Sequence, residues 1–222
     1  MSEDIRLGNE GYAEEAEALV RQYESVRFAD VHRHVLHLIP RAPSDVLDIG
    51  AGTGRDASAL ASMGHRVVAV EPTAEFRARA ARLHPSPRIE WVNDQLPHLP
   101  HLSRRGDRFD VVMVTAVWIH LDPEQRREAM PKVAALLRPG GLLALNLRHG
   151  PTPPGRRRLF ETSPDETSDL AAAHGLRTIV RVERQADFYG RTEVTWTSLA
   201  FLNEMPSGDG GSTAAESASP SA

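Results

Sequence analysis

Short apolar runs alternate with amphipathic segments along most of this chain. Five runs have the length and the Val, Ile and Leu content of buried strands, at residues 45–49, 66–70, 88–92, 109–115 and 142–147. Three segments between or after them carry apolar residues at helical spacing, at residues 55–63, 73–83 and 123–137. Strands separated by helices favour a parallel sheet in an α/β fold.

The two ends of the chain follow different patterns. Residues 12–39 have apolar positions at helical spacing, which predicts one or two amphipathic helices before Pro40. Near the other end, a helical segment at 164–173 precedes two strand patterns, at 176–182 and 194–201, with no helical pattern between them. We therefore expect these last two strands to pair antiparallel, which completes a mostly parallel seven-stranded sheet with an antiparallel last strand.

Length and composition limit the possible classes of protein. The chain has 222 residues, 41% hydrophobic and 25% charged, which suits one soluble globular domain. A net charge of −4 gives no field for nucleic acid or anionic lipid, and the absence of cysteine excludes disulfides and thiolate chemistry. No apolar stretch approaches the roughly 20 residues of a membrane span, and the acidic N-terminus does not resemble a signal peptide. We expect a cytoplasmic protein.

The main chemical signal is a glycine-rich turn between the first strand and the first following helix. Gly50, Gly52 and Gly54 alternate with other residues in DIGAGTG, so backbone amides are open to a close ligand. Glu71 ends the second strand, 71 − 48 = 23 residues after Asp48, where a carboxylate is placed to accept both hydroxyls of a ribose. The pattern predicts a nucleoside-containing cofactor. A dinucleotide fingerprint is the alternative, but it would put Asp48 and Gly50 inside a strand.

These residues carry a family resemblance. DIGAGTG together with Glu71 resembles the first two motifs of class I S-adenosylmethionine-dependent methyltransferases, and the likeness extends over Val46 to Leu147, through NDQLP and LLRPGGLL. The resemblance implies a Rossmann-like doubly wound fold and S-adenosylmethionine as cofactor. It places Asp48 beneath the methionine portion and Asp94 at the adenine amino group. The cofactor-binding residues that it implies are Asp48, Gly50, Ala51, Gly52, Gly54, Glu71, Pro72, Asp94, Gln95 and Thr115.

Further positions follow from the same resemblance. His120 lies after the fourth strand, where the family places the acceptor, so it is a candidate general base; packing of the following turn is the alternative. Trp118 and Tyr23 are candidates for substrate contact. We expect residues 1–43 to form a helical lid, residues 44–205 the methyltransferase domain and residues 206–222 a disordered tail. The sequence shows no metal-ligand cluster.

The acceptor class is predicted only coarsely. Enzymes that methylate exocyclic amines of nucleic-acid bases usually carry Asn or Asp, then Pro-Pro and an aromatic residue, after the fourth strand. Here that stretch is Thr115-Ala116-Val117-Trp118, and no RNA-binding motif accompanies it. The sequence therefore favours methyl transfer to an oxygen or nitrogen of a small molecule. A protein, peptide or RNA acceptor, or a non-catalytic cofactor-binding module, stays as an alternative, and neither the acceptor nor the oligomeric state is determined.

Overall fold

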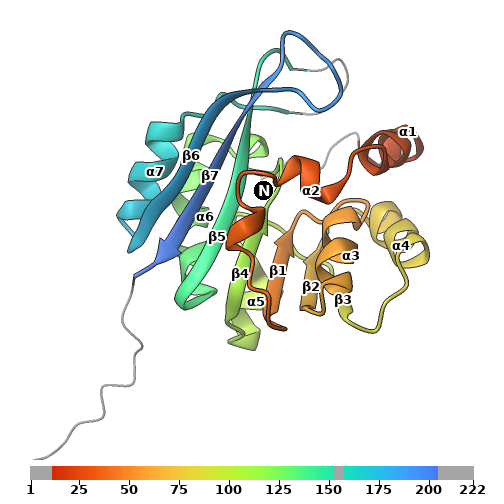
Figure 1. Ribbon diagram of the computed structural model, residues 1–222, viewed down its shortest axis with the longest axis horizontal. Helices are drawn as coiled ribbons and strands as arrows, with labels where there is room; N and C mark the ends of the chain where they lie inside the picture. The colour runs from red at the N-terminus through yellow and green to blue at the C-terminus, as the bar shows by residue number, and fades with distance from the viewer. Residues whose placement is uncertain (1–11, 153–157, 205–222) are drawn as a thin grey trace, which may run out of the picture.

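A seven-stranded sheet organises the molecule, and Figure 1 shows it between the helices. The structure is a computed structural model that describes residues 12–152 and 158–204. The strands are β1 (Asp45–Ile49), β2 (Arg66–Val70), β3 (Ile89–Val92), β4 (Phe109–Val114), β5 (Leu137–His149), β6 (Leu176–Ala186) and β7 (Thr195–Asn203). Their order in the sheet is β3-β2-β1-β4-β5-β7-β6. Only β7 runs against its neighbours, so the predicted Rossmann-like α/β fold with an antiparallel last strand is confirmed.

The strand order reverses beside β1. From β1 the chain moves first to β2 and β3 on one side, and then returns to β4 and β5 on the other. The loops that leave the carboxyl ends of β1 and β4 therefore diverge, and a crevice opens between them. Ligands of doubly wound sheets bind at such a switch point.

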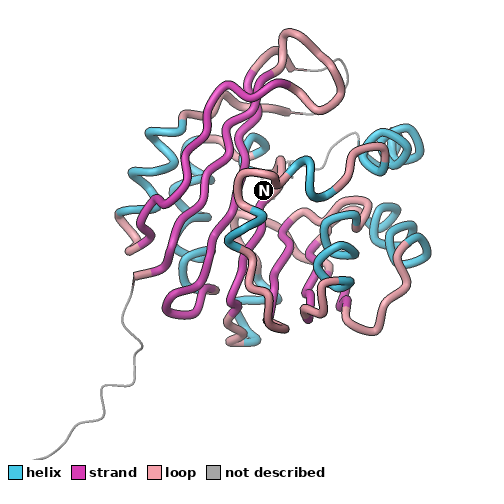
Figure 2. The backbone as a smooth tube through the Cα atoms, in the orientation of Figure 1, coloured by secondary structure: helices cyan, strands magenta, loops and turns pink. Residues whose placement is uncertain are grey.

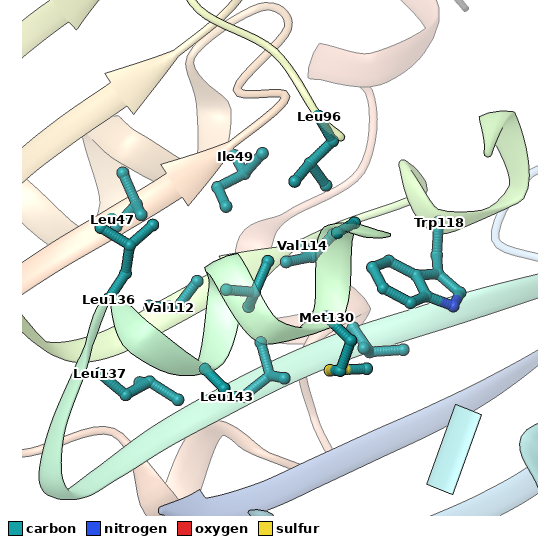
Figure 3. Close-up of a cluster of buried hydrophobic side chains, with 14 of the residues drawn as sticks. Leu47, Ile49, Leu96, Val112, Val114, Trp118, Met130, Leu136, Leu137 and Leu143 are labelled. Carbon is teal, nitrogen blue, oxygen red and sulfur yellow. The ribbon is translucent and has the colours of Figure 1, made fainter. Parts of the chain in front are cut away.

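Helices cover both faces of the sheet. They are α1 (Tyr12–Glu24), α2 (Phe28–Val31), α3 (Arg55–Ser62), α4 (Ala74–Leu83), α5 (Pro100–Arg105), α6 (Pro123–Ala135) and α7 (Pro164–Ala172), with 3-10 turns η1 (Leu36–Leu38) and η2 (Trp118–His120). Adjacent strand residues face opposite sides: Leu47 packs in the core under α6, as Figure 3 shows, whereas Val46 packs in the core under α3. Apolar side chains on both faces explain why β1 reads as a continuous apolar run.

Helix α5 and the start of strand β5 differ from the sequence expectation, and β6 extends to Ala186, beyond the expected end at residue 182. Helix α5 was not predicted, because its six residues carry little helical periodicity. Its start is stabilised from outside the helix, since the backbone amides of His101 and Leu102 donate to Asp94 Oδ2. Strand β5 begins at Leu137 rather than at residue 142, because Leu137 pairs with Phe109 across a register shift.

The expected helices of the N-terminal segment are present as α1, α2 and η1. The predicted tail, residues 206–222, lies outside the described residues. Within the described ranges, no helix has the length and the apolar character needed to cross a membrane.

Candidate active site

A cleft lies over the carboxyl ends of β1, β2 and β4 and continues along β5. Most residues expected at the site line this cleft: Tyr23, Asp48, Gly50, Ala51, Gly52, Glu71, Pro72, Asp94, Gln95, Thr115 and His120. Figure 2 shows that the N-terminal segment and the long connection between β6 and β7 lie at this same end of the sheet. The cleft therefore has walls from segments far apart in the sequence.

The glycine-rich turn forms the floor. The amides of Gly50 and Ala51 donate to the carbonyl of Val70 at 2.8 and 2.9 Å, which fixes the turn against the end of β2. A Cβ atom on Gly50 would lie 2.3 Å from Val117 Cγ2, so the fold itself requires this glycine. A Cβ atom on Gly52 would meet only the Gly50 carbonyl oxygen, at 3.9 Å. The space in front of Gly52 is thus open for a ligand.

Glu71 connects the ends of β1 and β2. Its Oε2 accepts a hydrogen bond of 3.0 Å from the amide of Gly52, and its Oε1 accepts one of 2.8 Å from the amide of Thr73. Burial raises the pKa of this carboxyl group, and the two amides oppose that rise. Each carboxylate oxygen has a second acceptor site, so the group still fits a vicinal diol such as that of a ribose.

Asp48 is buried at the end of β1 with an unsatisfied oxygen. Its side chain is 1% exposed, and Oδ2 has no hydrogen-bond partner among the described residues. Burial, and next the charge of Asp56, raise the pKa of Asp48 well above its ordinary value. A buried carboxyl group in this state fits a cationic ligand group, which would supply the missing partner.

Asp94 stabilises the start of α5 through its hydrogen bonds. Besides the two amides at the start of α5, it accepts a hydrogen bond of 3.0 Å from the amide of Gln95. The side chain is 4% exposed and lines the cleft after β3. Asp94 therefore anchors α5 whether or not it also receives an adenine amino group.

Polar contacts attach the N-terminal segment to α3 beside the glycine-rich turn. His32 Nε2 lies 2.7 Å from Asp56 Oδ2, and both side chains are buried. Arg55 donates from Nε to Asp56 Oδ1 at 2.7 Å and from Nη1 to the carbonyl of Tyr23 at 3.2 Å. Although burial opposes it, contact with His32 and Arg55 leaves the pKa of Asp56 below its ordinary value.

The turn η2 directs its residues to different sides. His120 lines the cleft, and its Nδ1 lies 3.0 Å from the carbonyl oxygen of Arg158. Because a carbonyl only accepts, this contact places the ring proton on Nδ1 and makes Nε2 the basic atom of the neutral ring. Trp118 points the other way and is fully buried in the core with Met130 (Figure 3). It therefore does not line the cleft, contrary to the prediction from the sequence.

The connection between β6 and β7 forms another wall of the cleft, which we call the far wall. Asp187 is the shared hydrogen-bond acceptor of this connection. This buried carboxylate accepts hydrogen bonds from the amide of Tyr189, from Arg191 Nε and Nη2, and from Trp196 Nε1, at 2.7 to 2.9 Å. These contacts hold the pKa of Asp187 below its ordinary value although burial opposes them. They present Phe188 and Tyr189 to the cleft.

Comparison with known proteins agrees with the sequence motifs. Residues 46–141 match a family model described as a methyltransferase domain. The chain carries a class I methyltransferase domain. An uncharacterized methyltransferase from Mycobacterium tuberculosis is 36% identical over 109 residues, which are 49% of this chain and 41% of that protein. A trans-aconitate 2-methyltransferase from Azoarcus is 30% identical over 162 residues, 68% of this chain and 59% of its own length. The chain thus spans about half the length of these relatives.

A solved structure shares the fold over nearly the whole chain. The 1,6-didemethyltoxoflavin-N1-methyltransferase of Burkholderia thailandensis, with bound 1,6-didemethyltoxoflavin and S-adenosylhomocysteine, superposes with a TM-score of 0.63. It covers 91% of this chain and 93% of its own, at 22% identity. At this identity the likeness supports the fold alone.

Two of the residues expected at the methyltransferase site do not line the cleft. Besides Trp118, Gly54 packs away from it, since a Cβ there would lie 3.0 Å from the ring of Trp91. Sequence reasoning missed the residues of the far wall, among them Asn146, Arg148, Phe188 and Trp196. The sequence hinted at these residues only through the frequent polar and aromatic residues near the ends of the last strands. That pattern does not indicate which of the side chains share a face of the sheet.

Proposed function

We propose that this protein binds S-adenosylmethionine in the cleft and transfers its methyl group to an oxygen or nitrogen atom of a small molecule. The observation that carries the proposal is the Glu71 carboxylate, which bridges the amides of Gly52 and Thr73 at the open floor of the cleft. If the ribose diol of S-adenosylmethionine faces this carboxylate, the methionine end of the ligand would lie near Asp48. The unsatisfied Asp48 oxygen suits an ammonium group there.

The remaining donor contacts follow from the same placement. Asp94 and Gln95 would meet the adenine, and Ala51, Pro72 and Thr115 would line the donor between adenine and methionine. When bound, the donor supplies a methyl carbon made electrophilic by its sulfonium. The protein has to hold that carbon in line with the acceptor and exclude water.

His120 is the candidate base. A hydroxyl or amine acceptor forms a new bond to the methyl carbon while the carbon–sulfur bond breaks, and the acceptor proton passes to His120 Nε2. S-adenosylhomocysteine leaves as the neutral thioether. The orientation of the ring by the Arg158 carbonyl supports this assignment, because it leaves Nε2 as the basic atom.

The cleft is covered on two sides, which favours a small acceptor over a polymer. Tyr23 and the His32–Asp56 contact bring the N-terminal segment to one side, and Tyr189 covers the other. We extend the proposal to residues 1–43 as a lid on the methyltransferase domain. The relatives named above include enzymes whose names specify small-molecule substrates, and a cytoplasmic location stays a prediction.

Calorimetry and label transfer test the proposal together. We expect the full chain to bind S-adenosylmethionine and S-adenosylhomocysteine but not NAD, and to move label from the methyl donor to the small-molecule fraction of a cell lysate. Binding of NAD in place of the methyl donor contradicts the cofactor assignment. Label in protein or RNA instead of small molecules contradicts the acceptor class, and donor binding without any transfer indicates a non-catalytic module.

A further inference from the structure

Asn146 lies at the boundary between two halves of the cleft. The donor half is the part that we assign to S-adenosylmethionine, lined by residues from 48–95 together with Thr115. The acceptor half is the remainder, lined mainly by η2, β5 and the β6–β7 connection. Asn146 belongs to β5, lines the cleft and contacts Ala116, the residue that follows Thr115. Its side chain therefore lies where the proposed donor and its acceptor would meet.

One hydrogen bond determines how the Asn146 side chain is oriented. Ala116 donates from its backbone amide to Asn146 Oδ1 at 2.7 Å. Because a backbone N–H only donates, the atom that faces Ala116 is the oxygen, and Nδ2 takes the other side. Asn146 is 6% exposed, and no described residue accepts a hydrogen bond from Nδ2. The wall of the cleft thus contains a buried NH2 group that is open to an acceptor atom of a ligand.

Ala116 holds Asn146 in place at a cost in backbone strain. Its φ of 57° lies in the left-handed region, which residues other than glycine seldom adopt. Backbone strain of this kind persists only where the surrounding structure maintains it, and it is frequent at ligand sites. Here the strained residue is the one whose amide fixes the carboxamide of Asn146. The strain therefore supports a ligand-binding role for the oriented NH2 group.

A hydrogen-bond donor at this point distinguishes oxygen from nitrogen acceptors. A neutral amine nitrogen has one lone pair, and methyl transfer uses it. A carboxylate or hydroxyl oxygen has a further lone pair, which can accept from Asn146 Nδ2 while the first attacks the methyl carbon. An aliphatic amine is moreover a cation at pH 7. The carboxylates among the described lining residues, which could pair with it, all belong to the donor half: Asp48, Asp56, Glu71 and Asp94.

We propose that the methyl group is transferred to an oxygen atom of the acceptor, a carboxylate or hydroxyl oxygen that Asn146 holds with a hydrogen bond from Nδ2. This inference rests on the proposed function and specifies its target atom. The new oxygen–carbon bond forms as the carbon–sulfur bond breaks, and S-adenosylhomocysteine leaves as the neutral thioether. A carboxylate acceptor releases no proton, and the proton of a hydroxyl acceptor passes to the base of the proposed function.

The atom that carries the transferred methyl group tests the inference. The full chain is incubated with S-adenosylmethionine, labelled at its methyl carbon, and the small-molecule fraction of a cell lysate. Chemical shifts of the labelled methyl group separate oxygen from nitrogen products, and base hydrolysis releases labelled methanol from methyl esters but not from ethers. We expect the label on oxygen. Label on nitrogen or carbon overturns the inference and leaves methyl transfer itself established. The absence of any transfer contradicts the proposed function, and the inference fails with it.

Asn146→Asp isolates the NH2 group. The variant keeps an oxygen for the Ala116 amide but replaces the donor with a carboxylate oxygen, which repels an oxygen nucleophile. The initial rate of transfer should fall at least about tenfold, with Tm and the affinity for S-adenosylhomocysteine nearly unchanged. The matched control is Gln125→Glu in α6, which likewise keeps an oxygen for the Asp122 amide and should behave as the wild type.

The variants separate acceptor binding from a structural role. Should Asn146→Asp unfold, Asn146→Ala provides the second variant and should show the same fall in rate. Equal rates in a folded Asn146 variant and in Gln125→Glu overturn the inference, because Asn146 then only braces the turn after β4. A fall in rate that is matched by an equal fall in affinity for S-adenosylhomocysteine also overturns it, since Asn146 would then serve the donor.

Discussion

At the scale of single residues, the binding role proposed for Asp48 comes at a cost in stability of the fold. A carboxyl group with an unsatisfied buried oxygen is unfavourable in the unliganded protein. Its raised pKa means that the folded protein holds this proton to higher pH than the unfolded chain does. Stability from this group is therefore present at low pH and is lost as pH rises from the ordinary pKa through the raised one.

Replacement of Asp48 by Asn should raise the melting temperature of the unliganded protein at pH 8. The neutral amide removes the cost of burying a charge, and each kcal/mol regained raises Tm by about 2–4 °C in a chain of this size. Differential scanning calorimetry without ligand measures the change, with the exposed Asp169→Asn as control. The gain should shrink at pH 4, and the variant should bind S-adenosylmethionine more weakly. A lower Tm at pH 8 would show that Asp48 serves the fold.

His120 is the residue whose role most directly separates catalysis from packing. His120→Ala should lower turnover about 10²- to 10⁴-fold, the usual contribution of a general base, with donor affinity changed less than about twofold. Label transfer to the small-molecule fraction gives the turnover, and calorimetry gives the affinity. The exposed His101→Ala is the control. Equal turnover in the two variants would reduce His120 to a structural residue of the turn.

At the scale of elements, the sequence predicts what local pattern determines. Strand β1 and the turn through Gly54 were predicted to the residue, because apolar runs and alternating glycines are local signals. Helix α5 was missed because its start depends on Asp94, outside the helix. The inward orientation of Trp118 was missed too, since it depends on how η2 packs on α6.

The contact between the N-terminal segment and α3 should make stability sensitive to acid. The pKa of Asp56 is lowered in the folded protein, so its stabilising contribution is present above the ordinary carboxyl pKa of about 3.9 and is lost as pH falls below it. His32→Ala removes one partner and should cost about 1–3 kcal/mol at pH 7, because Arg55 still pairs with Asp56.

Urea unfolding of His32→Ala at pH 7 and pH 3 measures both effects. The difference between wild type and variant should be smaller at pH 3, because Asp56 has lost the His32 contact in the variant and takes up a proton at a higher pH than in the wild type. His37→Ala, exposed in the neighbouring turn, is the control. A loss of stability that is the same at both pH values would indicate that His32 acts through packing, for example with Phe28, whose ring lies 4.6 Å away.

At the scale of the whole molecule, the two halves of the cleft differ in how far the sequence reveals them. The half that we propose for the donor comes from residues 48–95 together with Thr115, and the ends of β1, β2 and β3 in it follow one another along the chain. The acceptor half combines residues from η2, β5 and the β6–β7 connection, which meet only because β7 inserts between β5 and β6. Spacing therefore predicts the cofactor but not the acceptor.

Binding of the donor product should stabilise the molecule as a whole. At a free concentration of S-adenosylhomocysteine 100 times its dissociation constant, linkage predicts about 2.7 kcal/mol, or a rise in Tm of roughly 5–10 °C. NAD at the same concentration should give no rise. In Glu71→Gln only one acceptor oxygen remains, so the side-chain NH2 group would face the backbone amide of either Gly52 or Thr73. The same rise should therefore need roughly 10- to 100-fold more ligand. Thermal denaturation over a ligand series measures this displacement, with the exposed Glu75→Gln as control. If Glu71→Gln and Glu75→Gln respond alike, Glu71 only braces the glycine-rich turn, and the diol contact has to be assigned elsewhere in the cleft.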